Sequence, residues 1–139
     1  MRWYYLLAAL GLAASGCGGK GPTIAPVSGL VTMNGQPLAN ATVTFQPMRS
    51  QDKDPGPGSY GKTDLNGRFT LRLVGSDRPG AVVGKHRVAI TSGAAADTTN
   101  DRAPATKEGI PARYNTKSRL ETEVGPGGTE EANFPLKSP

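Results

Sequence analysis

The chain has 139 residues, of which 36% are hydrophobic, 19 are glycine and 12 are proline, and its formal net charge is +5. This length suits one small domain. The basic residues are scattered and nowhere form a run of five or more, so the charge pattern excludes a nucleic-acid-binding patch and predicts a solvated surface.

Residues 1–16 predict an export signal. Arg2 precedes an apolar run from Trp3 to Ala14, which is shorter than the roughly 20 residues that a transmembrane helix needs. Small residues follow this run, directly before Cys17, the only cysteine of the chain. The pattern therefore predicts a short cleavable segment and not a membrane-spanning helix.

The stretch Ala14-Ser15-Gly16-Cys17 resembles the lipobox of bacterial lipoproteins, with Ala14 where that family usually has leucine. The resemblance implies that Cys17 receives a diacylglycerol and, after cleavage, an acyl group on its new amino end. The chain would then be anchored in a membrane, because two or three acyl chains hold far more firmly than one. By the family's sorting rule, Gly18 implies the outer membrane of the cell envelope.

The alternative is an ordinary secretory signal that is cut near Ala14 or Gly16. It would leave Cys17 as a lone free thiol, which is unusual in an exported chain because oxidising compartments pair or modify exposed thiols. Acylation of Cys17 is therefore the favoured interpretation.

Residues 17–26 are rich in glycine and proline and are expected to form a flexible tether. The folded domain is then expected over 27–137. Within it, short stretches of alternating apolar and polar residues predict strands over 27–33, 41–45, 60–63, 68–73, 85–91, 120–124 and 132–136. No helical spacing extends over ten or more positions, so an all-β sandwich or barrel is predicted.

Turn residues separate these stretches. Asn34-Gly35 is the strongest two-residue hairpin signal, because both positions tolerate positive φ. Pro37 excludes a central strand after this turn, and Pro135 places the last strand at an edge. Residues 92–109 contain no large apolar side chain before Gly109, so they cannot offset their ordering entropy and are expected to form a flexible loop.

Asp64-Leu65-Asn66-Gly67 matches part of a calcium-binding loop. The full loop needs about twelve residues with further oxygen ligands, but Phe69 and Leu71 occupy that stretch. A tight turn is favoured instead, in which Asp64 bonds backbone amides and Gly67 has positive φ.

Three spaced motifs cover about residues 27–91: Val27-Ser-Gly29-x-Val31, Asn34-Gly35-Gln-Pro37-Leu38-Ala-Asn-Ala41-x-Val43-x-Phe45, and Thr63-Asp64-x-Asn66-Gly67-Arg-Phe69-x-Leu71. Together they resemble the carboxypeptidase regulatory-like domain. The resemblance implies a seven-stranded Greek-key β-sandwich of the transthyretin-like type. The later stretches 84–88 and 110–120 look like small bacterial lipoproteins that carry this domain alone and have no assigned activity.

Catalysis is not expected. His86 is the only histidine and has no cysteine partner in the domain, whereas a zinc site needs three or four ligands, so neither metal nor cofactor is predicted. The chain has no Gly-x-Ser-x-Gly nucleophile motif. It also lacks the several histidines and the carboxy-terminal Tyr-Arg-Gly-Ser of the hydrolase with the same fold that acts on 5-hydroxyisourate.

The sequence therefore predicts a lipid-anchored envelope domain that acts as a non-catalytic binding or structural module. Its expected partners are the membrane and an envelope protein or glycan, and no nucleic acid. One alternative is a carbohydrate- or peptidoglycan-binding module in which Tyr60 or Tyr114 stacks on sugars. The other is a small hydrolase, which would need His86 exposed in a cleft beside a nucleophile.

Overall fold

The computed structural model of the protein describes residues 21–50, 54–92 and 109–138. The predicted export signal, Cys17 and the interior of the predicted 92–109 loop lie outside these residues. No helix in the described ranges is long and apolar enough to cross a membrane.

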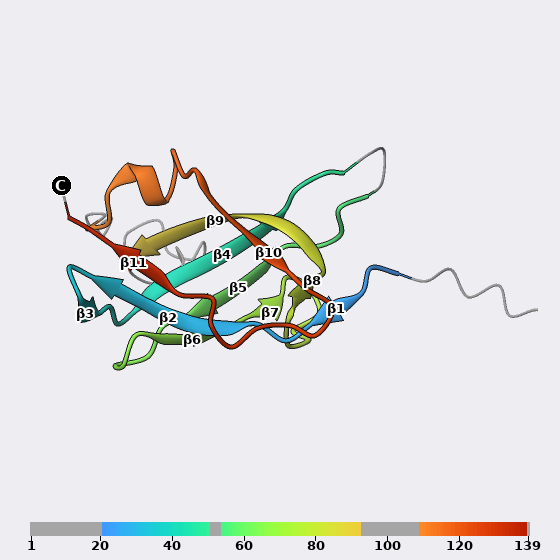
Figure 1. The fold of residues 1–139 in the computed structure, drawn as a ribbon, viewed down its shortest axis with the longest axis horizontal. Helices are drawn as coiled ribbons and strands as arrows, with labels where there is room; N and C mark the ends of the chain where they lie inside the picture. Colours follow the sequence, from blue (N-terminus) through green and yellow to red (C-terminus); the bar gives the residue numbers. More distant parts are fainter. Residues whose placement is uncertain (1–20, 51–53, 93–108, 139) are drawn as a thin grey trace, which may run out of the picture.

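The described chain is all-β and sandwich-like, with two larger sheets (Figure 1). One sheet has the strand order β10-β9-β4-β5-β7, and the other has β11-β2-β3 with β6 also paired to β2. A two-stranded sheet joins β1 to β8. The strands are β1 (Ile24–Ala25), β2 (Ser28–Met33), β3 (Gln36–Pro37), β4 (Ala41–Pro47), β5 (Ser59–Lys62), β6 (Arg68–Thr70), β7 (Arg72–Leu73), β8 (Ala81–Val82), β9 (Gly84–Ser92), β10 (Leu120–Val124) and β11 (Phe134–Leu136).

The core lies between the two larger sheets and is built from every second residue of their strands, as the alternating pattern predicts. Phe45 on β4 is fully buried, and its ring meets that of Phe134 on β11 edge-to-face at 6.0 Å between centroids. Phe134 in turn stacks on Phe69 of β6 at 6.2 Å. This aromatic series connects the sheets. Aliphatic residues surround it, among them Val31, Val43, Leu71, Val88, Ile90 and Leu136.

The predicted hairpin at Asn34-Gly35 is confirmed. Asn34 has φ +51° and Gly35 has φ +81°, as a two-residue hairpin turn with both central residues left-handed requires. Pro37 lies on the two-residue edge strand β3, and Pro135 lies on β11, which pairs only with β2 and runs parallel to it. Both prolines thus occupy edge strands, as expected.

The predicted strand over 68–73 is continuous in its inward and outward alternation, but it divides between the two sheets. β6 pairs with β2, whereas β7 pairs with β5. At the crossing point Gly61 of β5 lies so close to the segment that an added Cβ would be 2.5 Å from the Thr70 carbonyl oxygen. Side-chain alternation cannot reveal such a change of partner, because it records only which face of a strand is buried.

The predicted tether is shorter than 17–26, because its last part belongs to the fold. Ile24 and Ala25 form β1 and pair with β8, and Ala25 is buried. The Val83 amide also donates to the Thr23 carbonyl at 2.8 Å. This strand could not be predicted, because two residues are too few to show an alternating pattern and the stretch around them is rich in glycine and proline.

From Ile110, after the region predicted as a loop, the chain packs back on the sandwich, as predicted. Ile110 is buried, and a 3-10 helix, η1 (Ala112–Tyr114), contacts β9. It is the only helical element in the described residues.

Candidate binding site

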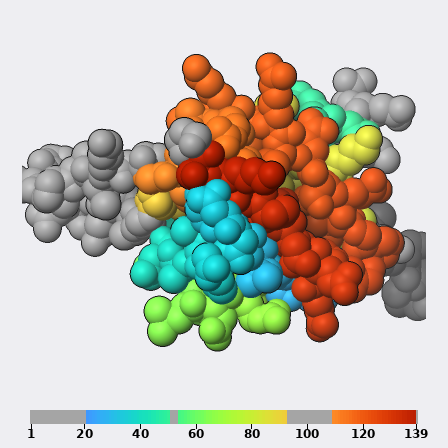
Figure 2. All heavy atoms as spheres, turned by 60° about the vertical axis from the view of Figure 1, so that its left-hand side comes forward, coloured from blue at the N-terminus to red at the C-terminus, as the bar shows by residue number. Residues whose placement is uncertain are grey.

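An open pocket of about 380 Å³ lies where β5 meets the segment formed by β6 and β7. The outward-facing residues of both segments line most of it, because successive side chains of a strand point to opposite faces. Figure 2 shows the adjoining turn region, in light green, projecting from the lower edge of the molecule. The lining residues are Tyr60, Gly61, Lys62, Asp64, Arg68, Phe69, Thr70 and Arg72.

The pocket is predominantly cationic. Lys62, Arg68 and Arg72 line it, against the single carboxylate of Asp64. One oxygen of Asp64, Oδ1, already accepts the backbone N–H of Asn66 at 2.8 Å and that of Arg68 at 3.0 Å. These bonds confirm the predicted turn and tie the carboxylate to the backbone. The pocket is therefore lined by three cations and one carboxylate, and that carboxylate already accepts two backbone hydrogen bonds.

Arg72 is the only one of these cations with an ion pair in the described residues. Its Nη1 atom lies 3.3 Å from Oδ2 of Asp77, and both side chains are exposed. An exposed pair of this kind contributes little to stability. Lys62 and Arg68 have no ion pair in the part of the chain that the structure describes.

Tyr60 is the aromatic residue of the pocket and is 44% exposed. It lies directly opposite Arg72 of β7 on one side and Thr44 of β4 on the other. Its ring therefore lies on the outer face of the five-stranded sheet, next to a cation and a small polar residue. Of the two tyrosines predicted to contact a ligand, Tyr60 has the accessibility that such contact needs.

Tyr114 has a different environment. Its hydroxyl oxygen accepts the Lys137 backbone N–H at 3.1 Å, and the guanidinium carbon of Arg113 lies 4.8 Å from its ring centroid. A hydrogen bond from the Arg113 side chain, followed by that from Lys137, lowers the pKa of Tyr114. The side chain is partly buried against the core, and no ring contact joins it to Tyr60 in the described residues. These contacts link η1 to the end of β11.

His86 faces the core, as its parity with Val88 and Ile90 predicts. It is fully buried, its ring lies 5.5 Å from that of Phe45, and its Nε2 is 2.6 Å from the Val82 carbonyl oxygen. Nε2 is therefore assigned the proton and donates it, while Nδ1 has no protein partner. Burial lowers the pKa of His86, and the hydrogen bond to Val82 opposes this effect only in part.

The buried His86 predicts a stability that depends on pH. Only the unfolded chain protonates this ring readily as the pH falls below the ordinary value of 6.5. The free energy of unfolding should therefore decline from about pH 6.5 until the pH has passed the lowered pKa of the folded state, by up to about 1.4 kcal/mol per pH unit. We expect His86→Phe, which keeps the planar bulk, to remove this part of the decline. Urea unfolding of both proteins between pH 5 and 8 measures it, and parallel profiles would contradict it.

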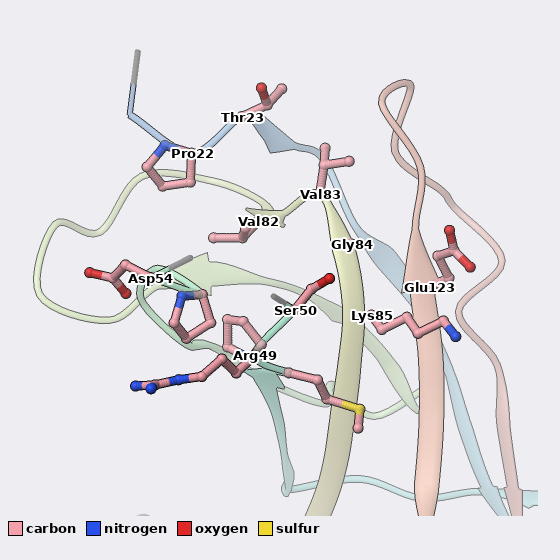
Figure 3. A pocket seen from close by; sticks show the side chains of 13 residues that line it. Pro22, Thr23, Arg49, Ser50, Asp54, Val82, Val83, Gly84, Lys85 and Glu123 are labelled. Carbon is pink, nitrogen blue, oxygen red and sulfur yellow. The ribbon is translucent and has the colours of Figure 1, made fainter. Parts of the chain in front are cut away.

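A larger cavity of about 670 Å³ lies at the end of the sandwich where the chain enters it (Figure 3). Pro22 and Val82 line one part of it, and the charges of its wall are of both signs. Arg49 and Asp54 lie on one side, and Lys85 and Glu123 extend from β9 and β10 on the other. No group of three or more potential metal ligands occurs in the described ranges. The mixed charge gives this cavity no preference for one class of ligand.

No family model, no curated protein and no solved structure matches the chain. The resemblance to the carboxypeptidase regulatory-like domain therefore stays a prediction. The two cavities differ in their lining residues. The exposed aromatic ring and the excess of cations favour the pocket beside Tyr60 as the candidate site.

Sequence reasoning selected Tyr60 but missed the cations around it. Lys62, Arg68 and Arg72 were assigned to a scattered, solvated surface. Their spacing contained a usable signal, because Arg68, Thr70 and Arg72 alternate with inward-facing residues and must share one face of the strand. That β5 lies beside this face follows from the pairing of β5 with β7 and could not be read from either segment alone.

Proposed function

We propose that the protein is an exported lipoprotein that is anchored by Cys17 in the outer membrane of the cell envelope. Its β-sandwich serves there as a non-catalytic binding or structural module. The observation that supports this proposal most is the place where the chain enters the fold. β1 begins at Ile24, only seven residues after Cys17, so an extended connection spans at most about 25 Å.

This short connection would keep the domain near the membrane. The β1–β8 end would face the lipid, and the turn between β2 and β3 would lie at the far end (Figure 1). The pocket beside Tyr60 lies on the outer face of β5 and is not covered by β1 or β8 in this arrangement. An anchored domain of this shape can present that face to another envelope component.

The fold within this proposal is a seven-stranded, transthyretin-like Greek key. The described structure has eleven strands, of which β1, β3, β7 and β8 have only two residues each. If β7 is counted with β6 as one alternating strand, and β1, β3 and β8 are set aside, seven remain. This count supports the resemblance to the carboxypeptidase regulatory-like domain.

The position of His86 supports a non-catalytic role. A general base must reach the proton it abstracts, whereas the His86 ring is buried against Phe45. The buried hydroxyl of Ser59 lies on β5, with β4 between it and β9. The hydrolase alternative required His86 exposed beside a nucleophile, and this arrangement gives it no support.

The second candidate function is a carbohydrate- or peptidoglycan-binding module. The specific observation in its favour is the exposed ring of Tyr60 beside a pocket. Tyr114 adds little to it, because its ring and hydroxyl are engaged by Arg113 and Lys137.

Substitution of the proposed anchor tests the proposed location. We expect Cys17→Ala to move the protein from the membrane pellet to the soluble fraction, because the thiol that receives the diacylglycerol is gone. Fractionation with immunoblotting measures this, and Ser15→Ala is the control that leaves the thiol in place. A Cys17→Ala protein that stays in the pellet as firmly as the native chain would refute lipid anchoring.

A further inference from the structure

We propose that the pocket beside Tyr60 binds an acidic saccharide, that is, a sugar unit carrying a carboxylate or a phosphate. The proposal rests on the envelope location proposed above and names the ligand class of the binding module. Tyr60 would contact the sugar ring, and Lys62, Arg68 and Arg72 would bind its charged group.

Two of the cations lie on the segment of β6 and β7, and the third lies on β5. Arg68 and Arg72 are four residues apart on one alternating segment, which corresponds to about 13 Å at the strand rise. Lys62 lies two residues after Tyr60 on β5, and both residues are exposed on the same face. The pocket thus offers donors along its length. Hydrogen bonds from charged donors to a carboxylate or phosphate are about twice as strong as neutral ones.

The close approach at Gly61 brings β5 against the segment of β6 and β7. Because Gly61 has no side chain, the Thr70 carbonyl can lie where a Cβ would be, and β5 can contact the crossing segment. Tyr60 then lies opposite Arg72, and Lys62 and Arg68 line the same pocket. The aromatic and cationic groups are therefore placed by the backbone crossing itself.

The exposed large hydrophobic residues lie on the same segment of the chain as this pocket, and one of them, Tyr60, lines it. Three large hydrophobic residues are exposed in the described ranges, namely Tyr60 (44%), Leu65 (86%) and Val74 (54%). All three belong to the segment 59–74, which runs from β5 through the Asp64 turn and β7 to Val74. Leu65 and Val74 are single exposed apolar residues, which need no explanation, whereas Tyr60 is exposed inside the pocket.

A saccharide fits this surface better than a nucleic acid. Single-stranded nucleic acids are bound through successive aromatic platforms along a basic groove, and this pocket has one exposed aromatic ring. Its volume of about 380 Å³ is at the small end of the range for small-ligand sites. One sugar ring against the electron-rich face of Tyr60, with its acidic group toward the arginines, matches both features.

Calorimetric titration of the full-length protein, purified in a neutral detergent, tests the proposal. The probes are an oligogalacturonate, a phosphorylated mannose oligosaccharide, neutral maltohexaose and a thymidine hexanucleotide. We expect at least one of the two acidic saccharides to bind, and which of them binds identifies the acidic group. Binding should weaken as salt is raised from 0.1 to 0.5 M, because exposed charges are screened.

Four variants assign the binding to the pocket, with their thermal midpoints as a check on folding. We expect Tyr60→Ala and the double variant Arg68→Gln/Arg72→Gln each to weaken binding about tenfold or more. Tyr60→Phe, which keeps the ring, should bind within about twofold of the native protein. Arg87→Gln is the matched control, because Arg87 is an exposed cation that lies opposite Glu121 outside the pocket.

Four results would overturn the proposal. They are failure of both acidic saccharides to bind, equal binding of maltohexaose, equal binding of the hexanucleotide, and an equal loss in Arg87→Gln. None of these results bears on Cys17, because the titration reads the pocket whether or not the chain is lipidated. The proposal of lipid anchoring and the proposal of saccharide binding can therefore be refuted separately.

Discussion

Phe45→Ala should lower the free energy of unfolding by about 3–5 kcal/mol, the usual cost of removing a buried phenylalanine. Phe45 is fully buried on the central strand β4. Its ring contacts Phe134 of the opposite sheet and His86 of the neighbouring strand. The substitution would leave a cavity between the two sheets, where the surrounding groups belong to several strands and cannot all move inward.

Urea denaturation of the native protein, Phe45→Ala and Tyr60→Ala measures this effect. Tyr60 is on the adjacent strand β5 but is exposed, so its removal should change the unfolding free energy by about 0.5 kcal/mol or less. Equal losses in the two variants would show that Phe45 is not part of a core between the sheets.

Gly67→Ala should cost about 2–5 kcal/mol, as the sum of two effects. Gly67 has φ +73°, which costs an L-residue about 1–2 kcal/mol. An added Cβ would also lie 2.5 Å from the carbonyl oxygen of Val31, a backbone atom held in β2. Val31 donates its N–H to the Gly67 carbonyl at 2.8 Å, so relief of the clash disturbs that bond and adds about 1–3 kcal/mol.

Gly35→Ala separates the two effects. Gly35 has φ +81°, but nothing lies within 4 Å of a Cβ added there, so this variant should show only the backbone cost of about 1–2 kcal/mol. Asn66→Ala, in the same turn as Gly67, should cost less than Gly67→Ala. Thermal or urea unfolding gives all three values. If Gly67→Ala were no more destabilised than Gly35→Ala, the close contact between the Asp64 turn and β2 would be refuted.

The strands themselves could be predicted from the sequence because one face of each is buried. Val43 and Phe45, or Val88 and Ile90, alternate with polar residues, and this period of two identifies a half-buried strand without knowledge of its partner. The partners could not be predicted in this way. The same alternation over 68–73 continues while the chain leaves β2 and joins β5, and two-residue strands such as β1 are too short to show any period.

The candidate site was predicted in part for a similar reason. Tyr60 could be selected as a single residue, because an aromatic side chain on a polar strand face is a usual ligand contact. Two of its cationic neighbours, Arg68 and Arg72, come from a segment later in the chain, and the position of Arg72 beside Tyr60 depends on the pairing of β5 with β7. Tyr114 was selected on the same grounds, but its contacts with Arg113 and Lys137 arise from the fold around η1.

The mass of the amino-terminal peptide, taken from protein isolated with its membranes, tests the central proposal most directly. We expect the mature chain to begin at Cys17, with a diacylglycerol on the thiol and an acyl group on the new amino end. The peptide would then be heavier than its amino-acid sequence by the mass of these lipids. A mature chain that begins at another residue, or an unmodified Cys17, would contradict the lipoprotein proposal.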